Sequence, residues 1–150
     1  SKNKIVIQNS SIINIIFWFD KKIIEDDFIA FSNSELQWIF SENEKKAGKF
    51  SQKITISLSD ADHLLEIKNS ELIKNFENMI RKELSVKHDT KLLRSLIIRS
   101  PKATQRTNDR KNITNYGKNI FFVGDWLVDD LPNTMEGASL SSKLLVEEKF

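Results

Sequence analysis

The spacing of apolar residues changes once along this chain, and this change constrains the fold more than any other feature. In residues 53–58 (KITISL), Ile54 and Ile56 alternate with polar residues, which is the two-residue period of a strand. Between residues 70 and 84 the apolar residues recur instead at about 3.6 residues and form one stripe: Leu72, Ile73, Phe76, Met79, Ile80 and Leu84. The two periods together predict a mixed α/β (α+β) fold.

More strands are predicted in the N-terminal half, where β-branched and aromatic residues are flanked by polar clusters. The segments are residues 5–7, 12–19 (IINIIFWF), 28–31 and 37–40 (QWIF). Residues 41–49 (SENEKKAGK) are polar and contain a glycine, so we expect an exposed hairpin loop there. This half therefore indicates an antiparallel sheet.

The helix predicted over residues 70–84 has Ser70 as its expected N-cap. A shorter helical turn is expected after Ser59 or Asp60. Residues 91–99 (KLLRSLIIR) return to strand character, and we expect Pro101 to end that strand because proline cannot donate to a ladder. Residues 102–118 are polar and are interpreted as an irregular crossing segment.

The C-terminal segment is predicted to form a strand, a loop and a helix. Residues 120–123 (IFFV) are apolar at consecutive positions, as in a strand that is covered on both faces, and Gly124 and Asp125 follow them. The helix is expected from about residue 134 to 148, with Asn133 or Thr134 as its cap. Its inward candidates are Met135, Ala138 and Leu145.

Composition excludes several classes of protein. The chain has 150 residues, no cysteine and a net charge of +2 with scattered basic residues, so we expect no disulfide, no thiolate site and no nucleic-acid partner. Its longest apolar run is far shorter than the roughly 20 residues that span a bilayer. The N-terminus shows no signal-peptide pattern, and a cytoplasmic protein is expected.

Few side chains predict chemistry on their own. The sequence contains no GxGxxG or Walker loop, no nucleophile elbow and no HExxH. His63 and His88 are interpreted as surface residues, and the acidic runs at 25–27 and 129–130 as solvated charge rather than paired acids or a cation site, so no metal is expected. Trp18 and Trp38 fit either core packing or the wall of a hydrophobic tunnel.

The stronger candidate is the segment from Gly124 to Ala138. A strand ends at Gly124, and a helix begins within about ten residues, so a strand terminus and free helix N–H groups could meet at one ligand. Gly124 would let the backbone approach a cofactor, and Asp125 would accept hydrogen bonds from hydroxyls. The alternative is a capped helix after a buried strand, with Asp125 pairing locally.

The letters NIFFVGDWLVDDLPNTMEGASLSS resemble the C-terminal flavin signature of the squalene-associated FAD-dependent desaturases, the hydroxysqualene dehydroxylase group, which is related to phytoene desaturases and flavin amine oxidases. The GDW and PxTMEGA parts carry most of the similarity. Residues 12–20 (IINIIFWFD), QWIF and SPKAT occur in the family's order, so the resemblance covers most of the chain. The departures are Leu127 where threonine is usual and Ser142 where glycine is usual.

The resemblance implies parts of two domains. Residues 1–105 are similar to the sheet and helix of a substrate-binding domain, and residues 106–150 to the last strand and helix of a Rossmann-like FAD-binding domain. It implies these FAD-contacting residues: Gly124, Asp125, Trp126, Thr134, Met135, Glu136, Gly137 and Ala138. Asp125 would contact the ribityl or pyrophosphate part, and the helix start would point at the isoalloxazine edge. No catalytic base is implied.

The function implied is that of the C-terminal portion of an FAD-dependent oxidoreductase acting on a hydrophobic isoprenoid such as a squalene precursor. Because no GxGxxG segment is present, we expect this chain to need an N-terminal FAD-binding half and to be inactive, without tightly held FAD, when alone. The family's lipid-soluble substrates imply peripheral membrane contact. The alternatives are a flavin amine oxidase or carotenoid desaturase fragment, or a non-catalytic remnant or interaction module that lacks the cofactor.

Overall fold

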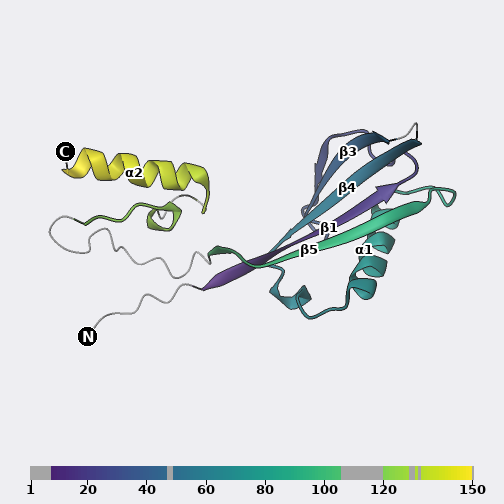
Figure 1. The fold of residues 1–150 in the computed structure, drawn as a ribbon, viewed down its shortest axis with the longest axis horizontal. Helices are drawn as coiled ribbons and strands as arrows, with labels where there is room; N and C mark the ends of the chain where they lie inside the picture. The colour runs from purple at the N-terminus through teal and green to yellow at the C-terminus, as the bar shows by residue number, and fades with distance from the viewer. Residues whose placement is uncertain (1–7, 47–48, 106–119, 129–130, 132, 150) are drawn as a thin grey trace. The chain divides into compact units, whose positions relative to one another are not determined.

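The computed structural model describes residues 8–46, 49–105, 120–128, 131 and 133–149 (Figure 1). The chain divides into two compact units. One unit is residues 10–103, and the other combines residues 1–9 with residues 104–150. Their assignment to a substrate-binding and an FAD-binding domain stays a prediction.

The first unit is built on a five-stranded antiparallel sheet in the order β2-β3-β4-β1-β5. The strands are β1 (Asn9–Phe19), β2 (Phe28–Ala30), β3 (Trp38–Lys46), β4 (Lys49–Ser59) and β5 (Leu92–Gln105). The short helix η1 (Asp62–Leu64) follows β4, and α1 (Asn69–Glu83) precedes β5. The prediction of a mixed α and β fold is confirmed in this coarse form; the described residues do not test its Rossmann-like part.

Helix α1 lies against one face of the sheet (Figure 1) and closes the core. Alternate residues of the central strands point into that core because neighbouring side chains of a strand point to opposite faces. The fully buried members include Ile13, Ile15, Phe17, Phe19, Ile54 and Ile56 from the sheet and Leu72, Phe76 and Ile80 from α1. The apolar stripe predicted for residues 70–84 is therefore the inward face of the helix.

The predicted N-cap of α1 is wrong by two residues. Ser70 lies inside the helix, and the N-cap position is Lys68, whose side chain makes no capping hydrogen bond. The Lys68 carbonyl instead accepts the backbone N–H groups of Glu71 and Leu72. Ser70 is exposed, so its hydroxyl can be hydrated without a cap.

The expected hairpin loop at residues 41–49 is also wrong, since β3 and β4 continue through almost all of it. Their register runs from Trp38 opposite Ser57 to Lys46 opposite Lys49, whereas β1 pairs with β4 only as far as Gln52. Beyond that point the β3–β4 hairpin is a two-stranded ribbon with no third strand from β1. Polar residues suit such a ribbon because both of its faces can contact water.

Pro101 does not end β5, which continues to Gln105. Within the described sheet β5 is an edge strand with β1 as its only neighbour. On the outer side of this strand the backbone N–H groups make no hydrogen bonds to another strand, so a proline, which lacks an N–H group, is tolerated there. The predicted strand at residues 5–7 lies outside the described residues.

The second unit contains a short helical turn, η3 (Asp125–Leu127), and the helix α2 (Met135–Lys149). Residues 120–123 do not form the predicted strand, because in the described part of this unit only Phe121 makes a single bridge and Ile120 and Val123 are exposed. A strand covered on both faces requires paired neighbours on each side. No helix in the described parts of the chain has the length and apolar character needed to cross a membrane.

Candidate functional site

The face of the sheet opposite α1 exposes large apolar side chains. Its exposed members are Phe28, Trp38, Phe40, Leu96 and Ile98, which are between 44% and 60% exposed. We call this surface the open face. Within residues 10–103 no described helix covers the open face. Single apolar residues are common on protein surfaces, but a cluster of this size indicates an interaction site.

Aromatic stacking organises one end of the open face. The ring centroids of Trp38 and Phe40 lie 6.3 Å apart with an interplanar angle of 14°, and Phe28 lies 6.4 Å from Trp38. Phe28 is paired with Phe40 in the β2–β3 register, so the three rings belong to one patch across two strands. A patch of this kind can contact a long hydrocarbon chain without requiring any hydrogen bond.

A row of charged side chains crosses the same face beside the aromatic patch. Glu42 and Lys53 are opposite each other in the β3–β4 register and form an ion pair of 2.8 Å. Lys53 is in turn opposite Trp18 on β1, and the Arg94 guanidinium lies over the Trp18 ring with its Cζ atom 3.7 Å from the ring centroid. The sequence predicts either core packing or a place in a ligand-binding wall for Trp18. In the structure Trp18 lies beneath this arginine and is 8% exposed.

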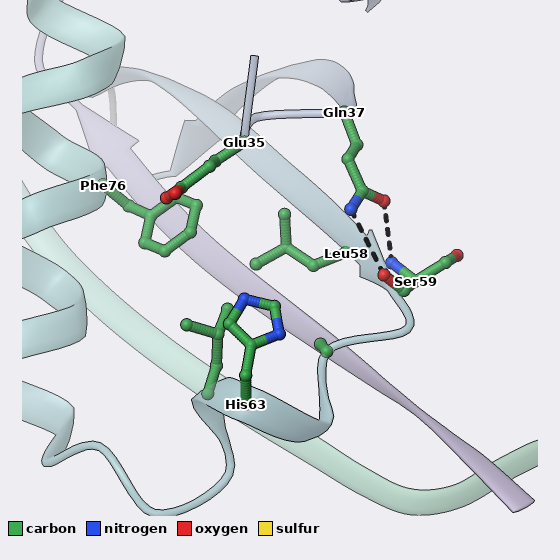
Figure 2. A pocket seen from close by; sticks show the side chains of 8 residues that line it. Glu35, Gln37, Leu58, Ser59, His63 and Phe76 are labelled. Carbon is green, nitrogen blue, oxygen red and sulfur yellow. Dashed lines mark hydrogen bonds between the residues drawn. The ribbon is translucent and has the colours of Figure 1, made fainter. Parts of the chain in front are cut away.

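A small pocket lies in the same unit between η1, β4 and the loop before β3. Figure 2 shows the Glu35 carboxylate and the His63 imidazole at this pocket, beside Phe76 of α1. Gln37 closes one side through two hydrogen bonds with the backbone of Ser59. The volume of this pocket is about 60 Å³, which can hold about two water molecules but not a long hydrocarbon chain.

Gly124 in the second unit has a structural role, and its approach to a cofactor stays a prediction. A Cβ atom at this position would lie 2.4 Å from Nε1 of Trp126, because the indole folds back over the glycine. The Gly124 N–H donates to Oγ of Ser141 on α2 at 2.8 Å, which ties the segment to the helix. The space expected for a cofactor beside the Gly124 Cα is thus occupied by the Trp126 side chain.

Asp125 is not paired locally in the described structure. It is the first residue of η3 and is half-buried, and no hydrogen bond or ion pair joins its carboxylate to another described residue. The alternative in which this carboxylate caps the following turn is not what the geometry shows, since η3 has no side-chain cap. Asp125 therefore keeps its capacity to accept hydrogen bonds from ligand hydroxyls.

The start of α2 is capped as predicted at Thr134. Its Oγ1 accepts the N–H of Gly137 at 3.4 Å, and its carbonyl accepts the N–H of Ala138 at 3.1 Å. Met135 is 89% exposed, so the prediction that it faces inward is wrong. The buried residues of α2 are Gly137 and Ser141, whose small side chains let neighbouring chain segments pack close to the helix. Glu136 is exposed beside Met135.

These residues fit a flavin in part. The exposed first turn of α2 and the unpaired Asp125 carboxylate provide a helix dipole and a hydroxyl acceptor. The Gly137 N–H is already used by Thr134, and Trp126 fills the space beside Gly124. A second pocket of about 170 Å³ is too small for FAD, and its lining combines the apolar Phe122, Leu127, Leu144 and Leu145 with Ser141 and Glu148.

The remaining candidates do not form a site. His63 and His88 are exposed and separate, and Glu25 forms an exposed ion pair with Lys22. Among the described residues no group of three or more histidine, aspartate or glutamate side chains could hold a metal; residues 129–130 lie outside the description. Sequence reasoning missed Arg94, since only the β1–β5 neighbour relation brings it to Trp18.

Comparisons with known proteins find distant relatives of this chain. The chain is 23% identical to a hydroxysqualene dehydroxylase of Sinorhizobium fredii over 85% of its length, and 27% identical to another of Zymomonas mobilis over 71%. It is 26% identical over 94% of its length to a 15-cis-phytoene desaturase of Synechococcus elongatus. No protein-family model matches the chain.

The chain spans only 30% of the length of the Sinorhizobium relative, 24% of the Zymomonas relative and 32% of the Synechococcus relative. Its distant homologues are therefore desaturase and dehydroxylase enzymes, each about three to four times as long as the region matched. These low identities, over part of each relative, support at most a likeness to hydroxysqualene dehydroxylases and phytoene desaturases, and they do not fix a single activity.

Proposed function

We propose that this chain is the C-terminal portion of an FAD-dependent oxidoreductase that acts on a long isoprenoid, of the hydroxysqualene dehydroxylase type. The observation that carries the proposal is the open face: a sheet with its core on one side and exposed aromatic and aliphatic side chains on the other. Squalene and phytoene, which the relatives' names contain, are long hydrocarbons that such a surface can bind by apolar contact.

The proposed cofactor contacts lie in the second unit. Asp125 would accept hydrogen bonds from the ribityl or pyrophosphate part of FAD, which agrees with its lack of a described partner. The N-terminal end of α2 would face the isoalloxazine edge, where the helix dipole stabilises the negative charge of a reduced flavin. FAD supplies the redox chemistry; the chain's residues bind and orient it.

A chimera tests this function. The matched third of the Sinorhizobium hydroxysqualene dehydroxylase is replaced by this chain, and a second chimera is made with the Synechococcus phytoene desaturase. With a two-electron reductant supplied for the flavin, we expect the first to retain flavin and to convert hydroxysqualene to squalene and water, measured by mass spectrometry. With a two-electron oxidant supplied instead, we expect the second to be less active on phytoene. A folded first chimera without flavin and without product would support the non-catalytic remnant instead.

Asp125→Ala in the active chimera separates a cofactor role from a structural one. We expect weaker flavin binding at an unchanged melting temperature of the apoprotein. The matched control is Asp62→Ala, because the Asp62 carboxylate accepts the Ser11 backbone N–H in the other unit and should affect stability rather than flavin content.

A further inference from the structure

Arg94 is held in one position on the open face. Its guanidinium stacks on Trp18, with 3.7 Å between Cζ and the ring centroid, and a planar cation over an indole is a favourable contact that leaves the N–H edge free. No hydrogen bond or ion pair joins this guanidinium to another described residue. Leu96 and Ile98 follow at alternate positions of the same strand, so the cation stands at the side of an apolar surface.

A second donor in the same stack also has no acceptor. The Trp18 side chain is 8% exposed, yet its indole Nε1–H is buried without a hydrogen-bond partner in the described structure. A buried donor without an acceptor is costly, and native structures normally satisfy it. Because this indole N–H has almost no accessible surface, the donor of the stack that a ligand can reach is the Arg94 guanidinium.

The surrounding charge favours a neutral oxygen group over a multiply charged one. The other cation of the row, Lys53, is already paired with Glu42. One unpaired guanidinium cannot neutralise a diphosphate, whereas a hydroxyl requires only one good donor. Adjacent apolar residues, Leu96 on the same strand and Ile16 two residues before Trp18, suit the hydrocarbon that carries that hydroxyl.

We propose that Arg94 is a specificity-determining residue that selects an isoprenoid alcohol over the corresponding hydrocarbon at the open face. This inference rests on the proposed function and makes it more specific: the hydroxyl oxygen accepts a hydrogen bond from Arg94 while the chain lies along the apolar strands. A substrate without oxygen leaves the guanidinium with no acceptor when it is desolvated.

Equilibrium dialysis with the 150-residue chain tests the inference, with radiolabelled farnesol and farnesene as the alcohol and hydrocarbon probes in a cyclodextrin carrier. In Arg94→Met we expect the farnesol affinity to fall about tenfold, the loss of one charge-assisted hydrogen bond, with farnesene affinity unchanged. Arg94→Lys should recover part of the farnesol affinity. Lys53→Met, a change of a paired cation on the same face, should alter either affinity by less than about twofold.

Four results would overturn the inference. Equal losses for farnesol and farnesene in Arg94→Met would mean that Arg94 only supports the face, and no loss for either would mean that it has no contact. If farnesyl phosphate binds, and only its affinity, not that of farnesol or farnesene, falls in Arg94→Met, Arg94 belongs to an anion site instead. If the wild-type chain, with a native circular dichroism spectrum, binds neither probe, the isoprenoid part of the proposed function fails as well; in the first three cases it survives.

Discussion

Gln52 provides the sharpest test of how the sheet is held to the loop after β1. Its side chain is fully buried, and Oε1 accepts the backbone N–H groups of Ile23 at 2.7 Å and Ile24 at 3.1 Å. Nε2 donates to the Ile24 carbonyl at 2.7 Å and to Oδ1 of Asn43 at 3.3 Å. One side chain thus satisfies three backbone groups of a segment that forms no strand.

Gln52→Met keeps the length and shape of the side chain and removes all four bonds. A buried polar group that loses its partner costs about 1–3 kcal/mol, and three backbone groups lose theirs. Because the loop can relax toward water, we expect the free energy of unfolding to fall by about 3 kcal/mol in total, measured by urea unfolding followed by circular dichroism.

Gln37→Met is the matched control, since Gln37 also makes two hydrogen bonds with a backbone, that of Ser59, but at an exposed position. Water can replace those bonds, so the expected loss is about 0.5–1 kcal/mol. A Gln52→Met protein within about 0.5 kcal/mol of the wild type, or less destabilised than Gln37→Met, would refute the reasoning.

Three further outcomes are expected. Gly124→Ala forces its new methyl against Trp126 and should lower the stability of the second unit by about 2 kcal/mol, measured by hydrogen exchange of the α2 amides, with a smaller loss when Trp126→Leu is also present. The hydrogen bond and charge of Lys21 lower the pKa of Asp89. The small contribution of this pair to folding stability is therefore fully present above the ordinary pKa of 3.8 and is lost as the pH falls through the lowered pKa. In Lys21→Met, a carbon-13 NMR titration should show that the Asp89 pKa rises. The purified chain alone should carry far less than one flavin per molecule, and stoichiometric flavin absorbance would contradict that expectation.

The sequence predicted those elements whose period is set by burial. The stripe of α1 and the alternation in β4 face one core, and both could be predicted because each buried position repeats at a fixed spacing. The loop expected over residues 41–49 was wrong because residues 44–46 belong to a two-stranded ribbon, which has no buried face to impose alternation. Pro101 was misjudged because the edge position of β5 depends on the strand order, which local sequence does not encode.

The candidate site shows the same limit. The GDW and PxTMEGA letters located residues 124–138, and the cap at Thr134 follows from its residue type. The position of Trp126 over Gly124 and the stack of Arg94 on Trp18 arise from side-chain packing and from strand neighbours distant in sequence. Pattern alone therefore singled out a cofactor segment, which stays a prediction, and missed the open face as one surface.

Pro101 also bears on how the chain behaves at high concentration. An edge strand as long as β5 is a template on which a second copy could add a strand, and unprotected edges of this kind lead to aggregation. A proline within the strand removes one donor from that template, and exposed Lys102 places a charge beside it. At the opposite edge, β2 is only three residues long and offers little backbone to pair with. Both edges of the sheet are thus poor starting points for polymerisation, and the apolar surface can stay exposed without sheets of different copies joining edge to edge.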